Sequence, residues 1–151
     1  MKHGADALRI AAAVLLVALF GGPAFAQSAP SPTVQEILIK TSLLTFNDAN
    51  VTGNFNVFYA RLAKPFRDQF PVEKVAETFK GFHDRNIRLD LVAIKTPVPS
   101  DEAKLDGNGR LTLKGYFDTS PSRVYYDLAY LKAGDEWQLV QITVNVKKPD
   151  Q

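Results

Sequence analysis

The chain has 151 residues, of which 46% are hydrophobic and 23% charged, a composition typical of one globular domain and too apolar for a disordered chain. It contains no cysteine, which excludes disulfides, iron–sulfur clusters, thiol catalysis and a lipid-bearing cysteine. The 18 basic and 16 acidic residues give a net charge of +2 and are interspersed, whereas a nucleic-acid-binding domain needs a clustered basic face. We therefore expect no nucleic-acid partner.

The first 26 residues have the pattern of a cleavable export signal. Lys2 and Arg9 provide a positive start, the apolar run from Ile10 to Phe20 follows, and residues 24–26 form a small-x-small cleavage site. A membrane-spanning helix needs about 20 apolar residues, and this run is much shorter. We expect cleavage after Ala26, a periplasmic or secreted location, and no membrane span in the processed chain.

A short polar linker, residues 27–32, is expected to lead into a single domain over residues 33–148. The first half of this domain has apolar residues at helical spacing, which predicts three helices. The first runs from Val34 and ends at Asn50 to Gly53, the second starts at the N-cap Asn54 and breaks at Pro65, and the third begins at Pro71 and fades near Arg85.

The second half alternates apolar and polar residues, which is the period of β-strands. The alternation predicts strands near residues 87–93, 111–117, 124–132 and 137–146, joined by turns at 106–109, 118–122 and 133–136. Short turns join antiparallel neighbours. The expected fold class is therefore α+β, with three N-terminal helices packed on a curved antiparallel sheet of about four strands.

These features resemble the nuclear transport factor 2-like superfamily, also called the cystatin-like cone fold, and in particular its small secreted bacterial members. The resemblance rests on the element order and on residues 53–70 and 115–146, the last of which include a closing hairpin with Trp137. The chain departs from larger members in having no clear strand between the second and third helices. The resemblance implies a cone-shaped pocket, which the superfamily uses for isomerases, dehydratases, ligand binding and protein docking.

Three side chains are candidates for isomerase- or hydratase-like catalysis, because an isomerase of the superfamily uses a pocket carboxylate with a tyrosine or a protonated acid. They are Asp48 near the end of the first helix, Tyr59 on the second helix and Asp127 on the tyrosine-rich strand. Structural roles are favoured, since no residue matches a specific family motif: Asp48 can cap the helix break, and Tyr59 can fill the core with its hydroxyl bonded to the backbone.

Metal and cofactor sites are not expected. His83 and Asp84 are adjacent on a helix and point in different directions, and His83 is the only histidine outside the leader, so a zinc site lacks ligands. The segment from Asp106 to Arg110 departs from a calcium loop at Arg110 and again at Leu111, where a glycine is needed. No phosphate-binding glycine loop is present.

Two further sets of residues are candidates for binding. The alternation of the last strand places Trp137 and Leu139 on the face opposite Val140, Ile142 and Val144. Trp137 and Leu139 could therefore form a surface that binds a protein partner, or a homodimer contact through the sheet face. The aromatic residues of the second and third helices either fill the core or line a ligand pocket: Phe55, Phe58, Tyr59, Phe66, Phe79 and Phe82.

The sequence therefore favours a non-catalytic exported module that binds a small apolar ligand or a protein partner. An isomerase- or hydratase-like enzyme is one alternative. A structural accessory protein of an envelope assembly is the other, and it would have an envelope protein as its partner.

Overall fold

The computed structural model describes residues 28–149, so the leader expected over residues 1–26 lies outside the described residues. Four α-helices and a 3-10 helix precede five strands. The helices are α1 (Pro32–Thr52), α2 (Asn56–Ala60), α3 (Lys64–Arg67), α4 (Val72–Asp84) and the 3-10 helix η1 (Asp90–Ile94). The strands are β1 (Val98–Pro99), β2 (Lys104–Leu105), β3 (Arg110–Phe117), β4 (Arg123–Ala133) and β5 (Glu136–Lys147).

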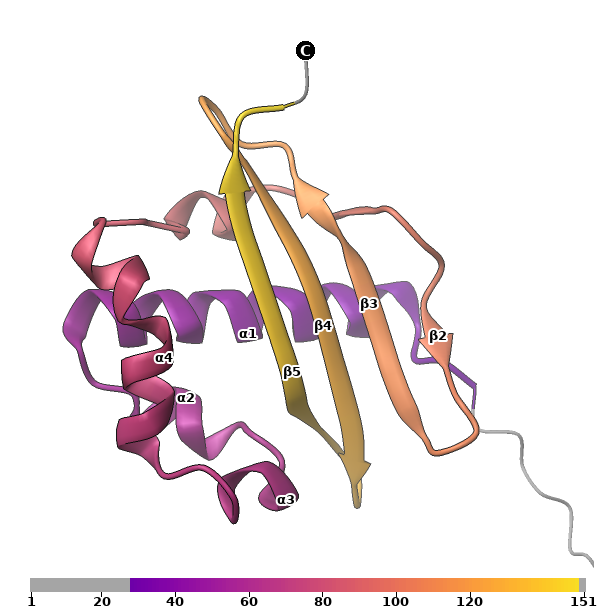
Figure 1. Ribbon diagram of the computed structural model, residues 1–151. Coiled ribbons are helices and arrows are strands. Elements are labelled where there is room, and N and C mark those ends of the chain that lie inside the picture. Colours follow the sequence, from indigo (N-terminus) through magenta and orange to yellow (C-terminus); the bar gives the residue numbers. More distant parts are fainter. Residues whose placement is uncertain (1–27, 150–151) are drawn as a thin grey trace, which may run out of the picture.

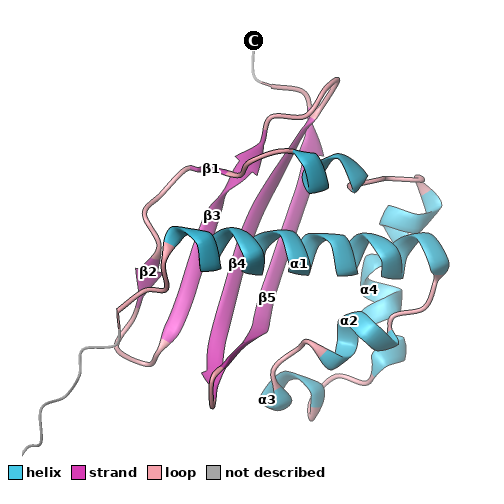
Figure 2. Ribbon diagram, turned by 180° about the vertical axis from the view of Figure 1, so that it is seen from behind, coloured by secondary structure: helices cyan, strands magenta, loops and turns pink. Residues whose placement is uncertain are grey.

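The strands form one antiparallel sheet in the order β1-β3-β4-β5, and β2 also pairs with β3. Helix α1 crosses one face of this sheet, and α2, α3 and α4 gather beyond the β5 edge (Figures 1 and 2). The predicted α+β class is confirmed, with four α-helices instead of three and five strands instead of about four. The described residues contain no helix that is both long and apolar enough to cross a membrane.

Helix α1 ends where the sequence predicts, but it begins at Pro32, before the expected start at Val34. The Ser31 side chain accepts a hydrogen bond from the Val34 N–H, and Gly53 ends the helix in the left-handed conformation that glycine adopts most readily. The predicted linker is shorter than expected, because α1 already begins at Pro32. The preceding residues also contact the domain, since Ala29 packs against the core and the Pro30 carbonyl accepts a hydrogen bond from the Gln35 side chain.

The second predicted helix is two short helices. The N-cap of α2 is Phe55 and not the predicted Asn54, although the Asn54 side chain accepts a hydrogen bond from the Asn56 N–H at the start of this helix. Pro65 lies in the first turn of α3, where its missing N–H costs no helical hydrogen bond, and the extended Ala63 separates the two helices. The predicted break at Pro65 is thus confirmed, and it accounts for the additional helix.

The strand predicted near residues 87–93 is wrong, because residues 87–89 form no strand and the 3-10 helix η1 begins at Asp90. Leu89 and Val92 are buried whereas Leu91 is 47% exposed, so the buried positions are three residues apart, which is the 3-10 repeat. The buried Asn47 side chain on α1 accepts a hydrogen bond from the Leu89 N–H at 2.8 Å. This bond satisfies a backbone donor that a strand partner would otherwise satisfy.

The predicted faces of the last strand are also wrong, because β5 contains a bulge. Ala129 pairs with Gln141 and Tyr130 with Leu139, which leaves Val140 as an extra residue. The bulge brings Leu139 to the same face as Ile142, toward the helices. Leu139 is only 2% exposed and Trp137 packs against the core, so these two residues do not form an outer patch.

The core is built around α1 and the inner face of the sheet. The Phe46 ring of α1 contacts Phe58, Phe79 and Phe82 at centroid distances between 4.8 and 5.5 Å. From the sheet, the buried Tyr130 hydroxyl lies 2.9 Å from the Ser42 hydroxyl. The aromatic stripes of the predicted helices therefore serve mainly as core.

Candidate functional site

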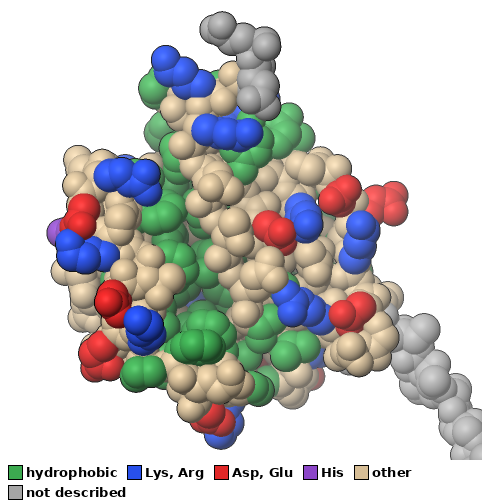
Figure 3. Space-filling model, viewed as in Figure 1, with side chains coloured by type: hydrophobic (Ala, Val, Ile, Leu, Met, Phe, Trp, Pro, Cys, Tyr) green, Lys and Arg blue, Asp and Glu red, His purple; other side chains and the backbone are tan. Residues whose placement is uncertain are grey.

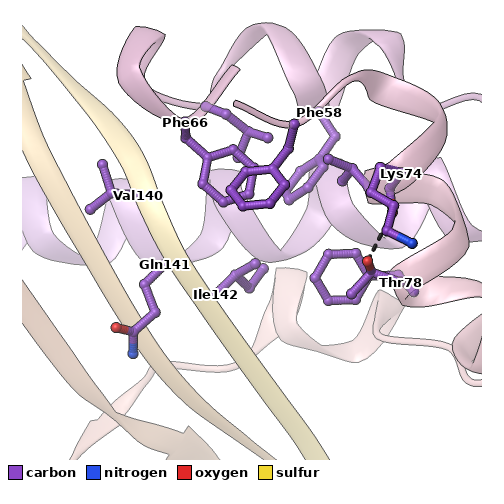
Figure 4. Close-up of a pocket in the computed structure, with 11 residues that line it drawn as sticks. Phe58, Phe66, Lys74, Thr78, Val140, Gln141 and Ile142 are labelled. Atoms are coloured by element: carbon purple, nitrogen blue, oxygen red, sulfur yellow. Dashed lines mark hydrogen bonds between the residues drawn. The ribbon is translucent and has the colours of Figure 1, made fainter. Parts of the chain in front are cut away.

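An apolar groove lies between β5 and the helices α2, α3 and α4. Its cavity volume is about 340 Å³. In Figure 3 it is a hollow of hydrophobic side chains between the helical part and the sheet. Figure 4 shows the aromatic rings on the helical side and β5 on the other. Its principal side chains are Phe58, Phe66, Phe70 and Phe79 from the helical side, and Val140 and Ile142 from β5.

The helical wall of the groove is stabilised by hydrogen bonds from a tyrosine side chain to backbone carbonyls. The Tyr59 hydroxyl lies 2.9 Å from the Arg67 carbonyl and 2.7 Å from the Phe70 carbonyl, and it shares its proton between them. This contact ties the α3–α4 connection to α2. The Phe66 and Phe70 rings, 4.8 Å apart, are thereby presented at the mouth of the groove, where Phe70 remains 41% exposed.

The β5 wall is the edge of the sheet. One end of this edge is covered, because Leu139 accepts a hydrogen bond from the Ala63 N–H at 2.8 Å and donates one to the Arg61 carbonyl at 3.1 Å. Between Val140 and Val146, no backbone hydrogen bond joins β5 to an element other than β4 within residues 28–149. A row of peptide groups at this edge therefore borders the groove.

The charged groups near the groove are paired at its rim. Lys74 Nζ lies 2.8 Å from Glu77 Oε2, and this hydrogen bond and charge lower the pKa of the Glu77 carboxyl. The Thr78 hydroxyl donates to the Lys74 carbonyl, as Figure 4 shows. Gln141 points away from the aromatic rings and accepts a hydrogen bond from Arg110. The groove interior is consequently apolar.

The structure divides the six aromatic candidates. Phe58, Phe66 and Phe79 line the groove, whereas Phe55 and Phe82 belong to the core and its other surfaces. Tyr59 supports the groove wall through its hydroxyl instead of lining it.

Sequence reasoning missed the remaining lining residues. Phe70 lies in the connection before Pro71, outside the apolar faces of the predicted helices. A large apolar side chain at such a position could have indicated a binding surface. Val140 lines the groove because of the bulge, for which the alternating sequence gave no signal.

The three catalytic candidates do not converge. Asp48 is exposed on α1. The Tyr59 hydroxyl is occupied by backbone carbonyls, and Asp127 lies 3.2 Å from Lys114 Nζ on the sheet face away from the helices. A general base has to lie within hydrogen-bond reach of its substrate beside the group that stabilises the product charge. These side chains cannot form such a pair in this arrangement.

The described residues also lack a cluster of three or more His, Cys, Asp or Glu side chains that could hold a metal ion. His83 Nδ1 lies 2.7 Å from the Asn50 carbonyl near the end of α1. We assign it a role in joining α4 to α1, since a histidine near a helix C-terminus can satisfy an unpaired carbonyl.

Comparison with known proteins gives no match to any family model, curated protein or solved structure.

Proposed function

We propose that this chain is an exported, non-catalytic binding module that holds an apolar group of its ligand or partner in the groove. The observation that carries the proposal is an open groove whose two walls are aromatic and aliphatic and whose rim charges are already paired. Small binding sites in proteins are typically concave and mostly apolar in this way. The leader pattern supports export.

The fold supports a proposed place in the nuclear transport factor 2-like superfamily. Helix α1 lies across the inner face of an antiparallel sheet, and the shorter helices flank one edge (Figure 2). The groove is lined by residues of these helices and of β5. A binding role agrees with the range of that superfamily, although fold alone does not define function.

The driving force for binding would be removal of apolar surface from water. Each square ångström of apolar surface that becomes buried contributes about 25 cal/mol. Phe70 offers such surface at the mouth, because 41% of it is exposed in the free protein. Few side chains of the interior can form hydrogen bonds, so few polar side-chain groups of the protein lose water when an apolar group enters.

The proposal is tested by titrating the purified protein with 1-decanol and following backbone amide signals by NMR. We expect saturable shifts at groove residues, and loss of those shifts in the variant Phe70→Asp, which places a carboxylate at the mouth. The matched control is Ile94→Asp, since Ile94 is an exposed apolar residue of η1 outside the groove. Shifts that are absent, or equal in both variants, would contradict the proposal.

A further inference from the structure

The groove combines apolar side chains with the unpaired edge of a strand. Antiparallel pairs alternate between residues that hydrogen-bond each other and residues that direct their peptide groups outward. The Leu139 peptide groups point away from β4, toward Arg61 and Ala63. Leu139 pairs with Tyr130, and the alternate β4 residues Leu128 and Tyr126 face Ile142 and Val144.

Every second residue of β4 has the same hydrogen-bonding direction, so Ile142 and Val144 are equivalent to Leu139. Their peptide N–H and C=O groups therefore point away from β4, toward the free edge of the sheet. Both residues also pack their side chains against the core. The N–H and C=O groups of the edge therefore lie beside an apolar wall. A small apolar ligand would desolvate these groups without bonding them, which costs free energy, whereas a peptide backbone would satisfy them.

We infer that the groove binds an extended, uncharged peptide segment of a partner protein as an added strand beside β5. This inference rests on the proposed function and specifies its ligand. The chain itself begins such an addition, since Leu62 forms a parallel bridge with Leu139 at the end of the groove. Bound peptides add to exposed sheet edges by the same main-chain hydrogen bonds, with alternate side chains in pockets.

The rim charges favour an uncharged segment. Lys74, the charged residue that lines the groove, is paired with Glu77, and Lys64 is paired with Asp68. Arg67 on α3 donates its hydrogen bonds to the Ala60 and Leu62 carbonyls. Side chains of an added strand alternate between two faces. The segment should therefore present apolar residues toward Phe58 and Phe79 at every second position and polar residues to solvent.

Neither described end of the chain fills the groove. Residues 28–31 enter α1 on the β2 side of the sheet, and Pro149 lies past the end of β5 (Figure 1). A second copy is disfavoured because the free edge of β5 is recessed beside α3 and α4, as the hollow in Figure 3 shows. Two recessed edges cannot approach each other, whereas a single extended strand can enter.

The test uses a capped peptide of alternating threonine and valine, about seven residues long, titrated into the purified protein by calorimetry. Two control peptides carry N-methyl groups, one on all valines and the other on all threonines. Only one edge of a bound strand meets β5, so one control should bind about ten-fold or more weakly, because it loses amide donors. The other control should bind like the parent peptide.

The protein variants Val144→Pro and Val144→Ala provide a second comparison. Proline removes an outward N–H without removing a bond to β4, as tolerated on edge strands, whereas alanine keeps the N–H. We expect peptide binding about ten-fold weaker in Val144→Pro than in Val144→Ala. If Val144→Pro does not fold, the methylated peptides decide the question alone.

Several outcomes would overturn the inference. Equal binding of both methylated peptides would show that main-chain pairing is not used. Binding of decanol without binding of the peptide would refute the peptide and leave the proposed function intact, and binding of neither would refute both. A concentration-dependent dimer that Val144→Pro abolishes would identify a second copy as the occupant.

Discussion

Asn47 on α1 accepts a hydrogen bond from the Leu89 N–H at 2.8 Å through its side-chain oxygen, and its amide donates to Asp90 at 3.2 Å. One buried side chain thus fixes the start of η1 against the long helix, across 42 residues of sequence. The same site includes Arg88, whose hydrogen bond and charge lower the pKa of the Asp90 carboxyl. This clamp anchors the segment between the helices and the sheet.

Replacing Asn47 with alanine should therefore destabilise the domain. The change leaves the Leu89 N–H buried without a partner, and an unsatisfied buried group costs about 1–3 kcal/mol. Urea denaturation followed by circular dichroism measures the loss. Asn56→Ala is the control, because Asn56 is exposed on α2 and its substitution should change the free energy of unfolding by less than about 0.5 kcal/mol. Equal stability of both variants would contradict the role of the clamp.

Gly115 on β3 is required by close packing. A Cβ atom there would lie 2.3 Å from the Val98 carbonyl oxygen and 2.5 Å from the Tyr126 hydroxyl, and the first of these is backbone that cannot rotate away. Gly115→Ala should cost about 1–3 kcal/mol or more through overpacking. Gly107→Ala is the matched control, since nothing lies within 4 Å of its added Cβ. The difference between the urea unfolding midpoints of Gly115→Ala and Gly107→Ala checks the prediction.

Two buried tyrosines of β4 should respond oppositely to loss of their hydroxyls. The Tyr126 hydroxyl has no hydrogen-bond partner among the described residues, whereas the Tyr130 hydroxyl bonds to Ser42 and to the Leu38 carbonyl. Tyr126→Phe should leave stability unchanged or raise it, and Tyr130→Phe should lower it by about 1 kcal/mol. Thermal unfolding of the two variants at neutral pH distinguishes these outcomes, and similar losses in both would contradict the assignment.

The same tyrosines predict a loss of stability in alkali. Burial raises the pKa of Tyr126 from 10.0 to about 12, and burial also raises the pKa of Tyr130. Above pH 10 the unfolded chain releases these protons while the folded chain retains them, so the free energy of unfolding falls as pH rises toward 12. In Tyr126→Phe this decline should be shallower. Urea denaturation at a series of pH values measures the slope, and an identical slope in both proteins would argue against the shift at Tyr126.

The sequence predicted the elements that depend on local signals. Gly53 and Pro65 mark a helix end and a helix break because their backbone preferences act wherever they occur. It failed where a distant contact decides the conformation. Asn47 makes residues 90–94 a 3-10 helix instead of a strand, and no local pattern reveals a hydrogen bond to a residue so far along the chain.

The site was predictable only in part for the same reason. Phe58, Phe66 and Phe79 were found because they follow helical spacing, but spacing alone could not separate a groove wall from a core. The β5 wall depends on the bulge at Val140, which reverses the faces of the residues that precede it. A strict period of two therefore assigned Trp137 and Leu139 to the wrong side of the sheet.

The bulge itself can be tested by deleting single residues of β5. Removing Val140 should restore regular pairing, because Leu139 and Gln141 already face consecutive residues of β4, and every inner side chain keeps its face. Removing Thr143 instead shifts one half of the strand by one position and turns its inner side chains outward. Each exposed Leu, Ile or Val side chain then costs about 1.5–3 kcal/mol. We therefore expect the Val140 deletion to fold cooperatively with a narrower groove and the Thr143 deletion to lose most of its stability. Urea unfolding of both proteins checks this, and comparable losses would show that Val140 is not the extra residue.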